Sequence, residues 1–310
     1  MTKVAGLCVV RDAIDLIPAI CGHYLRLGFD RLAFLDDRST DGTFEFLQQL
    51  GRVDRRISVE RVEPGPEGQG VLMTLCANRL ISEGYDIFFP FDSDEFWNIN
   101  LATVVKLVET RGNCIFYAKF VQFVQDRSVD RCGPLDLLKA VSRAPVLFDR
   151  PTDAIEESGT YLTFAKPKVG FKSGTPVTIM FGQHKVTVRS PVHQVKDLEV
   201  FHLLLRGAEQ IDARSLRGTD MSDTRAERPG GGNHYFSEGR TPEGRQKLWM
   251  ANSANRLGML DTPLGQIMLI PDTRLRSVLI AATRFIALRH PILFWKAVAI
   301  ARRPPHARRW

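Results

Sequence analysis

The chain has 310 residues, 44% of them hydrophobic and 25% charged, which is the composition of a globular protein with room for one large domain and an appendage. Its formal net charge is +7, but residues 274–310 contain nine Lys and Arg residues and no Asp or Glu. The remaining 33 basic and 35 acidic residues give a net charge of −2, which excludes a uniformly basic nucleic-acid-binding surface.

The cysteines and the first residues of the chain argue against a zinc-binding or disulfide-stabilised protein and against a secreted or membrane-spanning one. The five cysteines are scattered and form no CxxC pair, so neither a zinc site nor a disulfide framework is indicated. Residues 1–3 lead directly into a strand-like segment, without the pattern of a signal peptide, and no apolar run is long enough to span a membrane. We therefore expect a cytoplasmic protein.

Strand-like and helix-like patterns alternate through the first 125 residues. Apolar runs predict buried strands at residues 3–10, 31–35, 57–62, 86–91 and 113–124. Apolar residues at helical spacing predict helices at residues 14–27, 44–50, 70–82 and 101–109. This order predicts an α/β fold with a mostly parallel sheet flanked by helices, because parallel strands are joined by right-handed helical crossovers.

The pattern weakens after residue 125. Residues 166–188 predict two short strands joined through Gly174, on which Lys166, Lys168 and Lys172 are expected to face solvent. Residues 217–243 are rich in Gly and Arg and predict a mobile loop. Residues 248–259 predict a helix, and residues 274–301 form an apolar and basic stretch that Pro291 interrupts.

Two clusters of carboxylates follow two of the predicted strands. Asp36 and Asp37 come after the second strand, and Asp92, Asp94 and Glu95 come after the fourth. In open α/β sheets, ligands bind outside the carboxyl ends of the strands, so we expect both clusters to approach one crevice. An acid in the first cluster can accept hydrogen bonds from a ribose or a base. Helix capping explains Thr40 and Asp41 but leaves Asp36 and Asp37 unexplained.

The second cluster has the chemistry of a divalent metal site. An aromatic-rich run stops at three acids in four residues, an arrangement that requires compensation by a cation or by solvent. Carboxylate oxygens suit Mg²⁺ or Mn²⁺, which commonly combine one or two carboxylates with the phosphates of a substrate. The alternative is a solvated acidic turn after a strand.

Three segments in order resemble the family 2-type GT-A glycosyltransferases, most closely the bacterial branch related to family 92 with its "DxDEF" motif. These segments are residues 9–12 (VVRD), 36–43 (DDRSTDGT) and 91–97 (FDSDEFW). The resemblance covers residues 4–125, and a weaker similarity continues through residue 205. It implies a GT-A-like (Rossmann-like) fold and an inverting transfer of a sugar from a nucleotide-diphosphate sugar to a hydroxyl acceptor, in cell-surface glycan synthesis with glycan or lipid-linked acceptors.

The resemblance also implies roles for individual residues. The nucleotide-binding residues would be Val10, Arg11, Asp12, Asp36, Asp37, Gln69, Asn78 and Ser93. Asp92 and Asp94 would hold Mn²⁺ or Mg²⁺ together with a late histidine, which would be His202 or, as the alternative, His184, with His193 as a third choice. No QxxRW motif is present, so the general base is open among Asp153, Glu156 and Glu157, in a segment that also suits a solvated acidic loop.

With this resemblance we divide the chain into three parts. Residues 1–215 would be the glycosyltransferase domain, with a nucleotide-binding half at residues 1–125 and an acceptor half at residues 126–215. Residues 216–245 would be a flexible Gly/Arg-rich loop, and residues 246–310 a helical, basic C-terminal extension.

Other functions fit the sequence less well. A nucleotidyltransferase should carry a Gly/Arg/Lys-rich phosphate loop after the first strand, and residues 9–12 do not supply one. A dehydrogenase is disfavoured because no GxGxxG follows a strand. The chain could also be a non-catalytic, membrane-associated glycan-assembly protein with a degenerate site, because no motif for the general base is present. The intact pair of Asp92 and Asp94 argues against this alternative.

The basic C-terminal stretch has two interpretations. Its apolar residues, its cations, Trp295 and Trp310 fit the surface of an anionic bilayer, which would place the protein peripherally at the inner face of the cytoplasmic membrane. The alternative is a pair of ordinary helices that pack on the domain.

Overall fold

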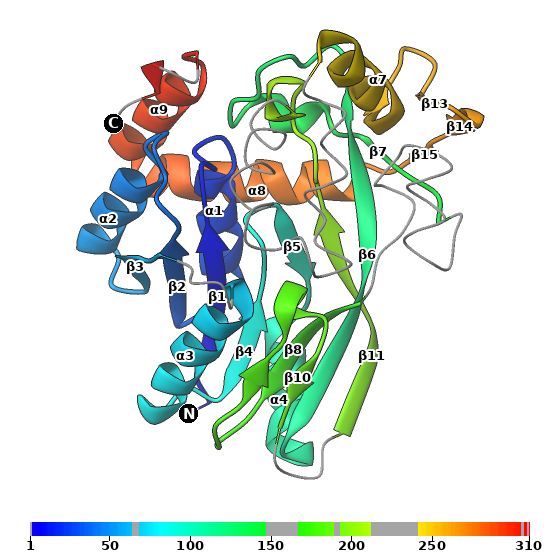
Figure 1. Ribbon diagram of the computed structural model, residues 1–310. Coiled ribbons are helices and arrows are strands. Elements are labelled where there is room, and N and C mark those ends of the chain that lie inside the picture. The colour runs from blue at the N-terminus through cyan, green and yellow to red at the C-terminus, as the bar shows by residue number, and fades with distance from the viewer. Residues whose placement is uncertain are drawn as a thin grey trace. The chain divides into compact units, whose positions relative to one another are not determined.

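The computed structural model describes residues 2–63, 68–146, 167–188, 193–211, 241–304, 307–308 and 310 (Figure 1). The chain forms two compact units. Unit 1 contains Met1–Phe120, Lys166–Phe201 and Val278–Trp310, and unit 2 contains Val121–Ala165 and His202–Ser277.

Four parallel strands form one part of the unit 1 sheet: β1 (Val4–Val10), β2 (Arg31–Asp36), β3 (Ile57–Arg61) and β4 (Ile87–Pro90), in the spatial order β4-β1-β2-β3. The side chains of β1 and β4 are buried almost throughout, as expected for apolar runs in a sheet covered on both faces. The predicted mostly parallel α/β architecture is therefore confirmed.

Helices connect these strands and flank the sheet. Their bounds agree with the predicted ranges to within a few residues: α1 (Ile17–Leu27), α2 (Thr43–Val53), α3 (Gln69–Ser82) and α4 (Leu101–Arg111). Helix α1 ends at Gly28, whose φ of 96° is the left-handed conformation that glycine adopts most readily.

Antiparallel strands extend the sheet beyond β4. Strand β8 (Lys168–Lys172) lies between β4 and the long strand β6 (Cys114–Asp126), antiparallel to both. Strand β5 (Glu95–Asn98), which the sequence pattern did not separate from the preceding loop, pairs with β11 (His193–His202). The first four residues of β8 are buried, because the strand is internal to the sheet and lies under covered faces.

Short elements complete unit 1. Strands β9 (Thr178–Ile179) and β10 (Val186–Thr187) form a two-stranded antiparallel sheet, with the 3₁₀ turn η2 (Phe181–Gln183) between them. The predicted pair of strands at residues 166–188 is thus three strands, with β8 in the main sheet.

Unit 2 is built from short strands and one described α-helix. Strand β7 (Ser142–Arg143) pairs with the end of β6 and with β15 (Ile270–Pro271). The helix is α7 (Pro242–Asn252), and the remaining elements are η1 (Asp136–Lys139), β12 (Ser253–Ala254), β13 (Met259–Thr262) and β14 (Gly265–Met268).

The helix predicted at residues 248–259 was wrong beyond Asn252, and the predicted helical extension at residues 246–310 contains strands β12 to β15. Strand β12 pairs in parallel with Gln125 and Asp126 at the end of β6, and β13 and β14 form a hairpin that turns at Gly265 with φ 108°. Here tertiary pairing overrides local helix propensity. Of the loop predicted at residues 216–245, residues 216–240 lie outside the described residues.

Two helices end the chain, α8 (Arg274–Arg289) and α9 (Pro291–Ala301), with Pro291 at the first turn of α9 as expected for a proline that interrupts a helical pattern. Within unit 1, α8 lies so close to α1 that a Cβ atom added to Gly22 would stand 2.1 Å from the carbonyl oxygen of Ala282. None of the helices in the described parts of the chain combines the length and apolarity needed to cross a membrane.

Candidate functional site

The parallel strands of unit 1 end at one edge of the sheet, which brings three loops together. Val10 at the end of β1 lies beside Asp36 at the end of β2, and Phe91, just after β4, donates its backbone N–H to the carbonyl oxygen of Leu7 at 2.9 Å. Burial raises the pKa of the Cys8 thiol on β1, and the charges of Asp92 and Glu95 raise it further. The loops after β1, β2 and β4 therefore begin at one edge of the sheet, and the crevice shared by the two carboxylate clusters stays a prediction.

The loop after β4, residues 92–95, is closed on itself, and we call it the acidic loop. The Glu95 N–H donates to the carbonyl oxygen of Asp92 at 3.0 Å, and the Asp92 N–H donates to Glu95 Oε2 at 2.8 Å. Glu95 is 2% exposed, and its backbone carbonyl accepts a hydrogen bond from the hydroxyl of Tyr24 on α1. The Glu95 side chain thus shapes the loop from inside the protein.

A buried lysine neutralises part of this loop. Lys168 Nζ on β8 donates to Asp92 Oδ2 at 3.0 Å and to Glu95 Oε1 at 2.8 Å, and the Lys168 side chain is 0% exposed. The expectation that Lys168 faces solvent was wrong, because β8 is an internal strand with both faces covered. Lys172 is partly buried, and Lys166 lies outside the described residues.

Burial and the ion pairs with Lys168 together determine the pKa directions in the acidic loop. Burial by itself would raise the pKa of Asp92, but the ammonium group of Lys168 holds it below the ordinary value. Burial raises the pKa of Glu95 well above its ordinary value, in spite of the same ammonium. The two carboxylates, which raise the pKa of Lys168 against the effect of burial, keep that side chain charged.

Gln69, at the start of α3, also contacts the acidic loop. Its Nε2 donates to Asp92 Oδ1 at 2.9 Å, so each Asp92 oxygen accepts a hydrogen bond from a different element of unit 1. Asp92 is nevertheless the more accessible carboxylate, with 37% of its side chain exposed against 2% for Glu95. Asp92 is therefore oriented by its partners and still open to solvent.

The residues of the acidic loop fit a divalent cation. Asp92, Asp94 and Glu95 place three carboxyl groups within four residues, and Lys168 contacts two of them, those of Asp92 and Glu95. Each carboxylate oxygen has two acceptor positions, so Asp92 can hold a cation while keeping its hydrogen bonds. Such hard oxygen ligands are the ones that Mg²⁺ and Mn²⁺ prefer.

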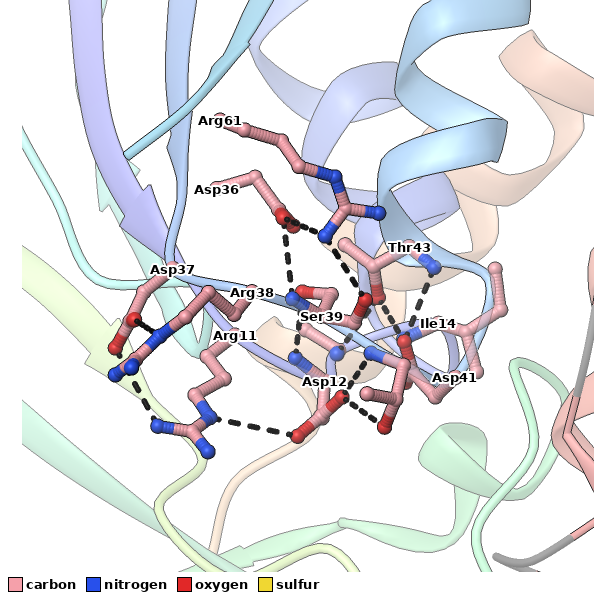
Figure 2. A network of polar contacts seen from close by, with 12 residues as sticks. Arg11, Asp12, Ile14, Asp36, Asp37, Arg38, Ser39, Asp41, Thr43 and Arg61 are labelled. Carbon is pink, nitrogen blue, oxygen red and sulfur yellow. Dashed lines mark hydrogen bonds and ion pairs between the residues drawn. The ribbon is translucent and has the colours of Figure 1, made fainter. Parts of the chain in front are cut away.

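The loops after β1 and β2 are tied together by hydrogen bonds (Figure 2). The Asp12 N–H donates to Ser39 Oγ at 3.0 Å, and Asp12 Oδ1 accepts from the Thr40 N–H at 2.8 Å. Asp12 has a φ of 47°, the left-handed region that non-glycine residues seldom adopt. We call residues 10–14 and 36–43 together the hydrogen-bonded loops.

Asp41 and Thr43 complete the tie between these loops. Asp41 Oδ2 accepts the Ile14 N–H at 2.9 Å, and its Oδ1 accepts from the Thr43 N–H and hydroxyl at 3.0 and 2.6 Å. Thr43 Oγ1 accepts the Ala13 N–H at 2.8 Å. Burial raises the pKa of Asp41 to about 6, and the negative charge of Asp12 adds to the effect. These two side chains are structural.

Asp36 and Asp37 have different surroundings. Asp36 is 0% exposed, and its Oδ2 accepts the Ser39 N–H at 3.1 Å and lies 3.4 Å from an Arg61 nitrogen. Burial raises the pKa of Asp36 against the lowering effects of Ser39 and Arg61. Asp37 is partly exposed and lies 3.0 Å from Arg38 Nε and 3.6 Å from Arg11 Nη1 (Figure 2). Of the two acids, Asp37 is the one that a ligand can reach.

The other predicted nucleotide-binding residues differ in accessibility. Val10 is 1% exposed, and its carbonyl oxygen accepts the Asp37 N–H at 2.8 Å. Asn78 pairs through both groups of its amide with the backbone of Val177, at 2.8 and 3.1 Å, and so ties α3 to the segment before β9. Ser93 lies in the acidic loop and is partly exposed.

The predicted late histidines belong to different units. His184, in unit 1, follows η2, and its Nδ1 lies 3.1 Å from the carbonyl oxygen of Pro167, which precedes Lys168. His202, in unit 2, has its Nδ1 2.6 Å from Gln122 Oε1. His193 is exposed at the start of β11. The base candidates Asp153, Glu156 and Glu157 lie outside the described residues.

Comparisons with known proteins give no family. No family model and no curated protein match the chain. The chain is similar to residues 1–349 of S. aureus TarS in complex with UDP (13% identity, TM-score 0.37) and in complex with UDP-GlcNAc (12%, 0.39), covering 97% of this chain and 88% of that one. It is also similar to a Bacillus anthracis chain assigned as a glucose-1-phosphate thymidylyltransferase, in complex with a sucrose (9%, 0.37; 76% and 99% covered).

Proposed function

We propose that this chain is a metal-dependent glycosyltransferase that moves a sugar from a nucleotide-diphosphate sugar to a hydroxyl acceptor. The observation that carries the proposal is the acidic loop, in which Lys168 and Gln69 hold the partly exposed Asp92, two residues before Asp94. The three segments that resemble GT-A glycosyltransferases, in the same order along the chain, are the reason for interpreting this loop as the metal site of a glycosyltransferase.

In this proposal Asp92 and Asp94 hold Mn²⁺ or Mg²⁺. When bound, such an ion neutralises a diphosphate and stabilises the negative charge that develops on the leaving group. Lys168 and Gln69 orient Asp92 before the ion arrives, so less conformational freedom is lost on binding. His202, with His184 as the alternative, stays a prediction for the third protein ligand.

The hydrogen-bonded loops would form the nucleotide side of the site. Arg11, Asp12 and Asp37 are partly exposed there and form a chain of ion pairs with separations of 3.6 and 3.8 Å. A carboxylate at this position can accept hydrogen bonds from ribose hydroxyls or from a base, and the guanidinium group can donate to a phosphate. Asp36 would support the loop from inside.

The remainder of the reaction rests on the sequence resemblance. We propose inversion at the anomeric carbon, with a carboxylate among Asp153, Glu156 and Glu157 as the base that deprotonates the acceptor hydroxyl. The same resemblance leads us to propose a role in cell-surface glycan synthesis, with a glycan or lipid-linked acceptor.

A thermal-shift screen of nucleoside diphosphates and nucleotide sugars, with and without Mn²⁺, tests the proposal. We expect one nucleotide to raise the Tm only when Mn²⁺ is present, because a ligand that binds only the folded state stabilises it. Asp94→Asn should abolish this shift, whereas Glu83→Gln, which changes an exposed acid at the end of α3, should keep it. If no nucleotide raises the Tm, the proposal is wrong.

Product analysis separates the proposal from its rivals. Incubation with the stabilising nucleotide sugar should release a nucleoside diphosphate, with the sugar transferred to an acceptor or to water. Release of pyrophosphate from a nucleoside triphosphate and a sugar phosphate would identify a nucleotidyltransferase instead. Nucleotide binding without turnover, over a panel of acceptors, would support the non-catalytic alternative.

A further inference from the structure

Three large apolar side chains are exposed where α8 ends and α9 begins. Leu288, Ile292 and Trp295 are 83%, 82% and 57% exposed. They lie within eight consecutive residues, on either side of the break at His290 and Pro291, where the chain turns from one helix into the next (Figure 1). We call these three residues the apolar corner.

The apolar corner is not the result of loosely packed helices. The opposite faces of both helices are buried in unit 1: Leu279, Ala282, Ile286, Phe294 and Ala297 are each at most 1% exposed. Gly22 of α1 allows the backbones of α1 and α8 to approach closely at Ala282. A soluble protein seldom groups large apolar side chains at its surface unless they contact a partner, so the firmly anchored corner indicates a docking surface.

The chain segment that forms the apolar corner, residues 274–310, carries charged side chains of one sign. The segment of residues 274–310 contains nine Lys and Arg residues and no acid, and Arg284, Arg289, Lys296, Arg302 and Arg303 are exposed. The Arg289 guanidinium stacks on the Phe285 ring at 4.4 Å, and Lys296 Nζ lies over the Trp310 ring at 4.3 Å. Asp54, whose charge acts on His290, is itself paired with Arg56 at 2.7 Å.

We propose that the apolar corner and its surrounding cations bind the surface of an anionic lipid bilayer. Apolar side chains would enter the boundary between headgroups and acyl chains, while the Arg and Lys side chains contact anionic headgroups. A second copy of this chain fits the surface poorly, since it would bring two clusters of cations together. The proposal is independent of the sugar-transfer reaction.

Vesicle flotation tests this proposal with the full-length protein. We expect the protein to float with phosphatidylcholine vesicles that contain about 30% phosphatidylglycerol, and at least tenfold less with pure phosphatidylcholine, because each cation near an anionic surface adds to the binding. The triple variant Leu288→Ser, Ile292→Ser, Trp295→Ser should lose at least tenfold in vesicle binding with an unchanged Tm, since these side chains are exposed.

Exposed apolar residues of unit 2 provide the matched control. Leu257, Leu264 and Met268 are 74%, 60% and 68% exposed, in and near the β13–β14 hairpin. Their triple change to Ser should leave vesicle binding as in the wild type. A second variant, Arg284→Gln, Arg289→Gln, Lys296→Gln, should weaken binding to anionic vesicles and reduce its dependence on salt.

Several outcomes would overturn the proposal. These are wild-type protein that binds neither kind of vesicle, equal binding to neutral and anionic vesicles, or a corner variant that binds like the wild type. A corner variant that changes only self-association in sedimentation velocity would show that a second copy covers this surface, and would overturn the proposal as well.

Discussion

The two groups of loops at the carboxyl edge of the unit 1 sheet are held in different ways. The acidic loop is held by the buried Lys168, which contacts Asp92 and Glu95, together with Gln69 and hydrogen bonds within the loop. The hydrogen-bonded loops are held mainly by backbone N–H groups that donate to the side chains of Asp12, Asp41 and Thr43 (Figure 2). The first group therefore depends on ion pairs with a buried lysine, and the second on hydrogen bonds between side chains and the backbone.

The difference indicates how each group is suited to its proposed task. A loop in which a lysine pairs with two carboxylates keeps unused acceptor positions on the carboxylate oxygens, which suits a cation. A loop held by hydrogen bonds to its own backbone has a fixed shape, which suits recognition of a nucleotide. The acidic loop should therefore be the more sensitive to loss of one partner.

Removal of Lys168 should have the largest effect on stability. Lys168→Met keeps the length of the side chain but leaves Asp92 and Glu95 without their counter-charge, and loss of one partner of a buried ion pair typically costs about 3–5 kcal/mol. Equilibrium urea unfolding would measure the change. Protonation of Glu95, whose pKa is already raised by burial, should reduce the loss in mildly acidic solution.

Lys119 is the matched control for Lys168. It pairs with Glu199 at 3.9 Å, and its side chain is 71% exposed, so Lys119→Met should change the free energy of unfolding by less than about 1 kcal/mol. The double variant Lys168→Met, Glu95→Gln should recover part of the loss, since the uncompensated carboxylate is then absent. A Lys168→Met protein as stable as the wild type would contradict the role given to this lysine.

The hydrogen-bonded loops should show a pH dependence of intermediate size through Asp41. Its pKa is raised by burial from 3.8 to about 6, so the folded state binds this proton more tightly than the unfolded state does. The contribution of Asp41 to the free energy of unfolding therefore falls as the pH rises from about 4 to about 6, by about 1–3 kcal/mol.

Urea unfolding at several pH values compares the wild type with Asp41→Asn, which cannot titrate. The wild type should lose more stability than the variant over this pH range. Asp54 should affect stability in the opposite direction, because its hydrogen bond to Arg56 lowers its pKa. Its contribution to the free energy of unfolding is lost as the pH falls through that lowered pKa. Identical pH profiles for the wild type and Asp41→Asn would contradict the burial of a charged Asp41.

The smallest effect is expected at Arg38. This side chain is 55% exposed and pairs with Asp37 at 3.0 Å, so Arg38→Gln should change the free energy of unfolding by less than about 0.5 kcal/mol. In the same variant, nucleotide affinity should change more than stability, because Asp37 is proposed to face the ligand. Isothermal titration calorimetry would measure the change in nucleotide affinity, and urea unfolding would measure the change in stability.

The sequence predicted the parallel part of the fold well. Strands β1 to β4 and helices α1 to α4 have strong local patterns, so apolar periodicity placed them within a few residues of their observed ends. The meeting of the loops after β1, β2 and β4 followed from the geometry of parallel strands alone. These features depend on contacts that the local sequence encodes directly.

The sequence did not predict the features that depend on pairing between distant segments, such as strand β5 and the burial of Lys168. Strand β5 is four residues long and directly follows a loop, so only its partner β11 identifies it. Lys168 was misread because strand periodicity cannot show whether a strand is internal to a sheet. One signal was available: three acids after an aromatic strand require a cation, and a lysine on a later strand could supply it.

The central claim is that Asp92 and Asp94 hold a divalent ion together with a nucleotide diphosphate, and binding of Mn²⁺ followed by electron paramagnetic resonance tests it most directly. We predict saturable binding of Mn²⁺ that the nucleotide found in the thermal-shift screen tightens, weakened at least tenfold in Asp94→Asn (about 1.4 kcal/mol) and unchanged in Glu83→Gln. Equal binding of Mn²⁺ by the wild type and Asp94→Asn, with or without the nucleotide, would contradict the claim.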